Sequence, residues 1–175
     1  MNEQDISRLV KSVMANLNPE TPAETITPHK CKCFKNMTLE VAKLLALKVE
    51  EKAKEMGVNA VVAVSNTGAR PVLVECMDNS YIASYDVALN KAYTVVALKM
   101  NTSKLKELSQ PNQPLYGIQF TNNGQIVIFG GGEPLIHKGL IVGGLGVSGG
   151  SEEEDTFLAS FGAEAFKEIM KEIDR

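Results

Sequence analysis

The chain has 175 residues, of which 44% are hydrophobic and 22% charged, and its formal net charge is −3. These values are typical of one globular domain that is large enough to bury its own core. They exclude a nucleic-acid binder that relies on clustered Lys and Arg, and no apolar run reaches the length of a membrane span.

The first segment, residues 1–17, has the spacing of an amphipathic helix. Its apolar residues recur every three or four positions, at Ile6, Leu9, Val10, Val13, Met14 and Leu17. Residues 18–28 contain three prolines and no apolar period, which predicts an extended linker. A helix this short is marginal alone, so it either packs on its own domain or docks in a groove of a partner. Its spacing also resembles the encapsulation peptides of enzymes packed into bacterial microcompartments.

A helix and a hairpin come next. Thr38–Met56 has a helical apolar stripe, and Gly57 ends it. Ala60–Ser65 is a β-branched run that predicts a buried strand. Pro71–Met77 predicts its hairpin partner, across a turn at Asn66–Gly68.

A second hairpin and further helices complete the predicted domain. Tyr81–Met100 predicts an Ala-rich helix, and residues 103–108 predict a short one. The later predicted elements are, in order, a strand at 125–129, a further candidate strand at 134–136, a strand at 140–147 and a helix at 152–173. Because hairpins require antiparallel pairing, the order predicts an α+β fold with helices packed on an antiparallel sheet.

Gly144, Gly146 and Gly149 have the G-x-G-x-x-G spacing of a dinucleotide-binding turn. That turn works only in a βαβ unit, with an acidic residue on the next parallel strand. The residues after Gly149 predict a single helix, so no such strand exists. The glycines instead predict close approach by a helix, a ligand or another subunit, followed by a helix start that favours an anion.

The segment TPHKCKCF carries the most chemically suggestive side chains. If it is extended, His29, Cys31 and Cys33 lie on one face and the lysines on the other. Imidazole and thiolate are good iron ligands, so His29 and Cys31 are the candidate metal and haem ligands. A zinc site would need a further ligand from Cys76 or His137. The alternative is that this segment is only the linker end, with His29 exposed and one Cys buried.

Several motifs in the rest of the chain match one family. They are V-x-V-x-x-x-G at 62–68, Met77-Asp78, A-x-x-K-A at 88–92, GGG-x-P at 130–134, GVSGG at 146–150, and Asp155. Over residues 37–172 the chain resembles the GlcG/HbpS family, which includes the C-terminal domain of PduO-type proteins of propanediol-utilising microcompartments. His137, expected in a hairpin turn, and Cys76, expected to face the core or an interface, depart from the family pattern.

The resemblance implies a profilin-like, three-layer α/β/α sandwich with a five-stranded antiparallel sheet, assembled into homo-oligomers. It also implies haem binding, with corrinoid binding suggested for the microcompartment branch, and the adenosyltransferase domain of full PduO is absent. The candidate cofactor-binding residues are His29, Cys31, Lys91, Gly131, Gly132, Ser148 and Gly149. Ser148 lacks the context of a nucleophile elbow, so no catalytic residue is assigned and binding is favoured over catalysis.

The sequence thus predicts a targeting helix at 1–17, a linker at 18–28 and a GlcG/HbpS-like domain at 29–175. We expect a haem- or tetrapyrrole-binding accessory protein whose residues 1–17 bind shell or cargo proteins. The odd number of cysteines, 3, and the lack of a secretory signal favour the cytoplasm, in a microcompartment lumen. The alternatives are an enzyme with a small-molecule or redox cofactor in a Gly-rich pocket, and a cofactor-free oligomeric scaffold that binds shell proteins.

Overall fold

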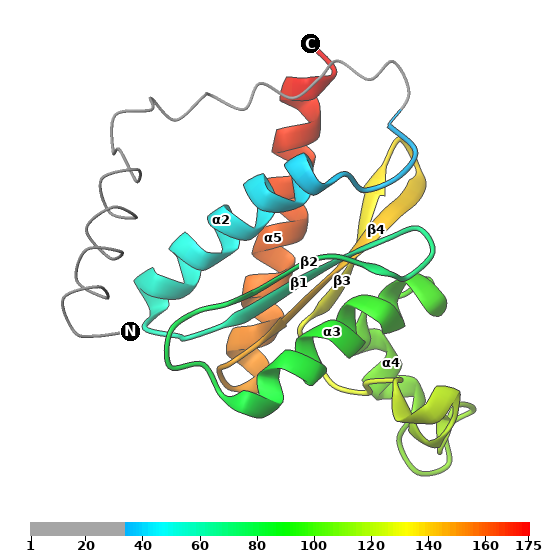
Figure 1. Ribbon diagram of the computed structural model, residues 1–175. Helices are drawn as coiled ribbons and strands as arrows, with labels where there is room; N and C mark the ends of the chain where they lie inside the picture. Colours follow the sequence, from blue (N-terminus) through cyan, green and yellow to red (C-terminus); the bar gives the residue numbers. More distant parts are fainter. Residues whose placement is uncertain (1–33) are drawn as a thin grey trace, which may run out of the picture.

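The computed structural model describes residues 34–175 (Figure 1). Its helices are α2 (Leu39–Met56), α3 (Ile82–Ala97), α4 (Thr102–Leu108) and α5 (Glu152–Ile173), with the 3₁₀ helices η1 (Ile118–Phe120) and η2 (Asn122–Gly124). Its strands are β1 (Val61–Asn66), β2 (Pro71–Cys76), β3 (Gly132–His137) and β4 (Leu140–Ser148). The helix predicted at 1–17, the linker at 18–28 and the candidate ligands His29 and Cys31 lie outside the described residues.

The sheet of residues 34–175 has four strands in the order β2-β1-β4-β3, and every neighbouring pair is antiparallel. This confirms the mixed α+β class and corrects the implied five strands. The strand predicted at 125–129 does not form, although Ile126 and Val127 are buried. The Val127 N–H donates to Thr94 Oγ1 at 3.0 Å, so a side chain of α3 takes the donor that a neighbouring strand would use.

Helices cover both faces of the sheet. On one face Val62 and Val64 of β1 pack in a cluster with residues of α2 and α5, among them Leu45 and Phe166. On the other face Val61 and Ala63 pack with residues of α3. Figure 1 shows α3 across the sheet from α2 and α5. Because both faces are covered, β1 is apolar at successive positions, as expected of a fully buried strand.

Helix α3 lies with its backbone directly on β4. A Cβ atom at Gly146 would stand 2.0 Å from the Ala88 carbonyl oxygen, and one at Gly144 would stand 2.5 Å from the Ala92 carbonyl oxygen. The glycines of β4 and the alanines of α3 therefore make one close contact. This confirms that the glycine-rich strand is approached by a helix.

The turns and helix ends follow the local sequence. Lys138 and Gly139 join β3 to β4 and both have positive φ, 49° and 78°, as a two-residue type I′ turn requires. Thr38 Oγ1 accepts from the Val41 N–H at the start of α2, and Gly57 ends it in the left-handed conformation. None of the helices in the described part of the chain combines the length and the hydropathy of a membrane span.

Candidate functional site

Lys91, a predicted site residue, lies completely buried between α3, β4 and the start of α5. Its Nζ donates to Asp155 Oδ2 and to the Val147 carbonyl oxygen, each at 2.7 Å. The same Nζ lies 5.0 Å from the centroid of the Phe129 ring. Phe129 directly precedes Gly130, Gly131 and Gly132 in the sequence. The side chain of Lys91 is 0% exposed and that of Asp155 is 5% exposed, so the pair is closed to solvent.

Burial shapes the protonation of this pair. Desolvation lowers the pKa of Lys91 and raises the pKa of Asp155, while the attraction between the two groups opposes both changes. Asp155 also accepts from the Gly150 N–H at 3.0 Å, which stabilises its ionised form. The ion pair therefore joins three elements through a network in which each charged group has several partners.

The structure brings together only some of the other predicted site residues. Gly131 lies against the buried pair, because a Cβ there would be 2.6 Å from Lys91 Nζ. Gly132 faces Thr102 instead, and the buried Ser148 hydroxyl donates to Ser84 Oγ at 3.2 Å. Gly149 directly follows Ser148, its backbone N–H donates to the Asp155 carboxylate, and it also lines a cavity.

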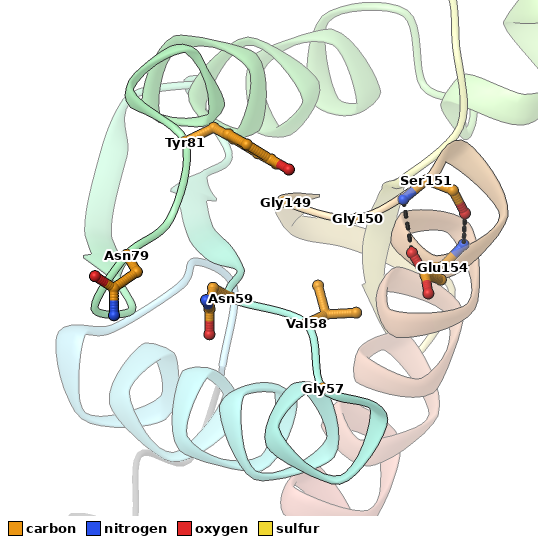
Figure 2. A pocket seen from close by; sticks show the side chains of 9 residues that line it. All are labelled: Gly57, Val58, Asn59, Asn79, Tyr81, Gly149, Gly150, Ser151 and Glu154. Atoms are coloured by element: carbon orange, nitrogen blue, oxygen red, sulfur yellow. Dashed lines mark hydrogen bonds between the residues drawn. The ribbon is translucent and has the colours of Figure 1, made fainter.

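This first cavity, of about 440 Å³, lies where the end of α2 and the starts of α3 and α5 meet. Figure 2 shows the Tyr81 side chain extending from the start of α3 in the direction of Gly149, with Asn59 and Asn79 at the side. The cavity is lined by Gly57, Val58, Asn59, Asn79, Tyr81, Gly149, Gly150, Ser151 and Glu154. Its polar lining suits a hydrogen-bonding ligand better than a wholly apolar one.

The start of α5 supplies its own anions. Ser151 and Glu154 form a capping box, in which the Ser151 N–H donates to Glu154 Oε2 at 2.7 Å and the Glu154 N–H donates to Ser151 Oγ at 3.2 Å (Figure 2). The Gly130 N–H donates to Glu152 Oε1 at 2.9 Å. The anion that the sequence predicts at this helix start is therefore present as the chain's own carboxylates.

A second cavity, of about 410 Å³, shares Asn59 and Asn79 with the first one and includes Cys76 and Glu50. Burial and a hydrogen bond with Glu75 raise the pKa of the Glu50 carboxyl. Cys76 is exposed at the end of β2, so it does not face the core, and its alternative place in an interface stays a prediction. Within residues 34–175, no three His, Cys, Asp or Glu side chains are grouped closely enough to hold a metal ion.

His137 lies at the opposite end of the sheet from both cavities. It is the last residue of β3 rather than part of the turn, and it is 8% exposed, so its expected position in the turn is wrong. Its ring packs edge-on against Phe34, with 5.9 Å between centroids. The buried Nε2 has no hydrogen-bond partner among the described residues and stands 3.6 Å from Asp174 Oδ2. Period-2 alternation along β3 was the sequence signal that could have placed this histidine inside.

Comparisons with known proteins agree on one family. A family model described as "Haem degrading protein HbpS-like" matches residues 37–164. The "Uncharacterized 15.0 kDa protein in dhaT-dhaS intergenic region" of Citrobacter freundii is 41% identical over 141 residues, which are 81% of this chain and 99% of that protein. The corrinoid adenosyltransferase PduO of Salmonella typhimurium is 37% identical over 109 residues.

The PduO match covers 62% of this chain but only 32% of PduO, so the chain spans about a third of that relative. A solved structure, the PduOC:heme complex, has a TM-score of 0.72 and 32% identity, and the match covers 74% of this chain and 94% of the solved one. These matches confirm the resemblance found in the sequence motifs. Since the family model spans most of the described residues, the chain belongs to the HbpS-like family.

Proposed function

We propose that this protein binds haem, or a related tetrapyrrole, as an accessory protein of a bacterial microcompartment. The observation that carries the proposal is the PduOC:heme complex, which shares the fold at a TM-score of 0.72 over 94% of its length. The family description names haem degradation, and PduO is named for a corrinoid. The descriptions of relatives therefore name two tetrapyrrole-type ligands, haem and a corrinoid. Haem has the stronger support, because a solved relative is a haem complex.

His29 and Cys31 are the iron ligands that we propose, and chain geometry limits where they can act. The five residues from His29 to Phe34 span at most about 18 Å. Strand β4, nine residues long, separates the Phe34 end of the sheet from the first cavity by about 26 Å. This reach favours the hairpin end of the sheet over the cavity of Figure 2 as the place of a haem held by His29 of the same chain.

The described residues at the hairpin end fit such a group. Leu140 is 59% exposed and offers apolar surface for a macrocycle on the His137 face of the hairpin, while Ile136, 46% exposed, lies on the opposite face. The Lys138 side chain is 69% exposed, and the exposed Lys35 directly follows Phe34. Two ammonium groups suit the two carboxylates that a haem carries.

Haem titration of the full-length chain tests the ligands. We expect a Soret band with wild type and an affinity at least about tenfold lower in His29→Ala and Cys31→Ala, because each loses an iron ligand. Cys76→Ser, which removes the exposed thiol at the other end of the sheet, is the matched control. Unchanged spectra and affinity in both ligand variants would overturn the assignment.

A second pair of variants tests the location. Leu140→Asp places a charge on the proposed apolar surface, whereas Leu47→Asp places one on α2, where Leu47 is similarly exposed, 50% against 59%. Weaker haem binding in Leu140→Asp alone supports the hairpin end. Equal affinities in the two variants would contradict it.

Targeting is tested with residues 1–28 fused to a fluorescent reporter in compartment-forming cells. We expect the fusion to gather in discrete bodies. Leu9→Glu, in the predicted apolar stripe, should abolish this localisation, whereas Lys11→Glu, on the predicted wet face, should keep it. Diffuse fluorescence of the unmodified fusion would count against an encapsulation peptide.

A further inference from the structure

The first and second cavities adjoin at two side-chain amides. Asn59 and Asn79 line both of them, and the cavity volumes are about 440 and 410 Å³. Each volume is within the range of small-molecule sites. We call the two adjoining cavities together the polar groove. It lies at the opposite end of the sheet from the place proposed for haem, and the haem function does not use it.

An anion fits the polar groove poorly. The backbone donors at the start of α5 are already used, because the Gly150 N–H donates to Asp155 Oδ1 at 3.0 Å and the Ser151 N–H donates to Glu154 Oε2 at 2.7 Å. The charged side chains of the lining are three carboxyl groups and one ammonium group, those of Glu50, Asp78, Glu154 and Lys54. A phosphate or carboxylate ligand would therefore meet mainly negative charge.

The hydrogen-bonding groups that the groove leaves open are neutral. Among the 9 residues that line the first cavity, Figure 2 marks hydrogen bonds only between Ser151 and Glu154. The amides of Asn59 and Asn79 and the hydroxyl of Tyr81 make none with the other lining residues. Amides and hydroxyls both donate and accept, which matches the hydroxyl groups of a ligand.

Tyr81 adds an apolar face on one side of the groove. Its side chain is 72% exposed, and it does not cap the start of α3. Figure 2 shows the ring nearly edge-on, so that one face is turned toward the space beside Val58. Val58 is only 5% exposed and offers little surface in return.

This one-sided arrangement favours a saccharide over a nucleobase. A nucleobase is flat and apolar on both faces, so it would find a partner on one face only. A sugar ring carries C–H groups that pack on the electron-rich face of an aromatic ring, while its hydroxyls lie at the rim. One tyrosine face with amides beside it meets both needs.

We propose that the polar groove binds a neutral saccharide, whose ring packs on Tyr81 and whose hydroxyls are bound by the Asn59 and Asn79 amides. The second cavity gives room for a second sugar unit beyond the two amides. The site goes beyond the proposed haem function and uses none of its ligands, so either proposal can fail alone.

Titration of the haem-free, full-length chain with neutral sugars tests the site. The probes are glucose, galactose, mannose, maltose and lactose, followed by calorimetry and by NMR of the isotope-labelled protein. We expect at least one of them to bind with a Kd below about 10 mM and to shift the side-chain amide signals of Asn59 and Asn79.

Variants of the lining test each part of the contact. Tyr81→Ala removes the apolar face and should weaken binding at least about tenfold, whereas Tyr81→Phe keeps the ring and should weaken it less. Asn59→Asp and Asn79→Asp replace a donor by a carboxylate of the same size and should each weaken binding at least about threefold. Asn79 has a φ of 64°, which aspartate also tolerates, so this variant keeps the local backbone.

The controls separate this site from unspecific sugar binding. Tyr116→Ala, at a tyrosine with a similar exposure of 66% in the loop after α4, should leave the affinity unchanged. Inorganic phosphate and adenosine should not displace the sugar. Absence of binding below about 10 mM for every probe, or wild-type affinity in Tyr81→Ala and in both asparagine variants, would overturn the proposal.

Discussion

The two ends of the sheet treat a buried titratable side chain in opposite ways. At the Ser148 end of β4, Lys91 is completely buried, and its ammonium has two hydrogen-bond acceptors at 2.7 Å and an aromatic ring above it. At the hairpin end, His137 is almost as buried, but within residues 34–175 its Nε2 has no hydrogen-bond partner. The first group is a cross-link within the fold, whereas the second keeps its capacity to bind something else.

This difference shows that burial alone does not identify a site. Sequence motifs drew attention to the Lys91 end, yet its buried charges, Lys91 and Asp155, are hydrogen-bonded to each other and to the backbone. The hairpin end has fewer motif residues, and its buried nitrogen has no partner among residues 34–175. Unsatisfied hydrogen-bonding capacity therefore separates the two ends better than the family motifs do.

The largest loss of stability is expected at Lys91, whose buried ammonium is fully hydrogen-bonded. Lys91→Met leaves the Asp155 carboxylate buried without its cation, which should lower the free energy of unfolding by about 3–5 kcal/mol. Urea unfolding monitored by circular dichroism measures this loss.

Two further variants sharpen the test at Lys91. The double variant Lys91→Met/Asp155→Leu should recover much of the loss, because no unpaired charge remains. Lys171→Met, in the exposed pair with Glu168, should change stability by less than about 0.5 kcal/mol. A Lys91→Met protein as stable as Lys171→Met would refute the structural role.

A smaller effect is expected at the hairpin end. His137→Phe keeps the ring volume and removes the unpaired nitrogen, so the free energy of unfolding of the variant should differ from that of wild type by less than about 1 kcal/mol. Urea unfolding measures this difference. A loss as large as that of Lys91→Met would remove the contrast between the two ends.

The smallest changes in stability are expected at two carboxyl groups, Glu133 and Glu152, whose pKa values change in opposite directions. Burial raises the pKa of Glu133 in β3 above its ordinary 4.5, with hydrogen bonds from Asn101 and Ser160 opposing the change. Unfolded chains then lose this proton first as the pH rises, so stability falls between pH 4.5 and the raised pKa. Glu133→Gln should therefore be more stable than wild type at neutral pH and equal to it below pH 4.5.

Glu152, at the Lys91 end, should behave in the opposite sense. Hydrogen bonds from Lys106 and from the Gly130 N–H lower its pKa below 4.5, so its contribution is complete above that value and is lost as the pH falls through the lowered pKa. Glu152→Gln should be less stable than wild type at neutral pH by less than about 1 kcal/mol, with the difference disappearing in acid. Urea midpoints across pH 3–8 for both variants check the two signs. Equal signs would contradict the assignment.

Much of the fold could be predicted because local signals were strong. Thr38 and Gly57 bracket α2 as expected, and the predicted second hairpin forms with a tight turn at Lys138-Gly139. As expected, residues 152–173 after the glycines of β4 form the single helix α5 and not a second parallel strand. In each case a few adjacent residues carry the necessary information.

The errors lie where a distant partner decides the outcome. Ile126 and Val127 have a strand-like sequence, but Thr94 of α3 takes a backbone donor that a strand would need. Lys91 was a candidate cofactor-binding residue and Asp155 part of the family pattern, yet their pairing spans 64 positions and no local pattern encodes it. His137 was assigned to the turn because its burial depends on Phe34 and on the end of α5.

The two-residue turn between β3 and β4 also determines on which side the imidazole lies. Successive side chains of a strand point to opposite faces, and the register His137–Leu140 is set by the length of the loop. A single residue inserted between Lys138 and Gly139 would shift that register and free β3 to rotate the histidine into solvent. The length of this loop, more than the identity of its residues, therefore keeps the His137 imidazole inside the protein. Homologues with a longer β3–β4 loop would present a different side chain at the hairpin end of the sheet.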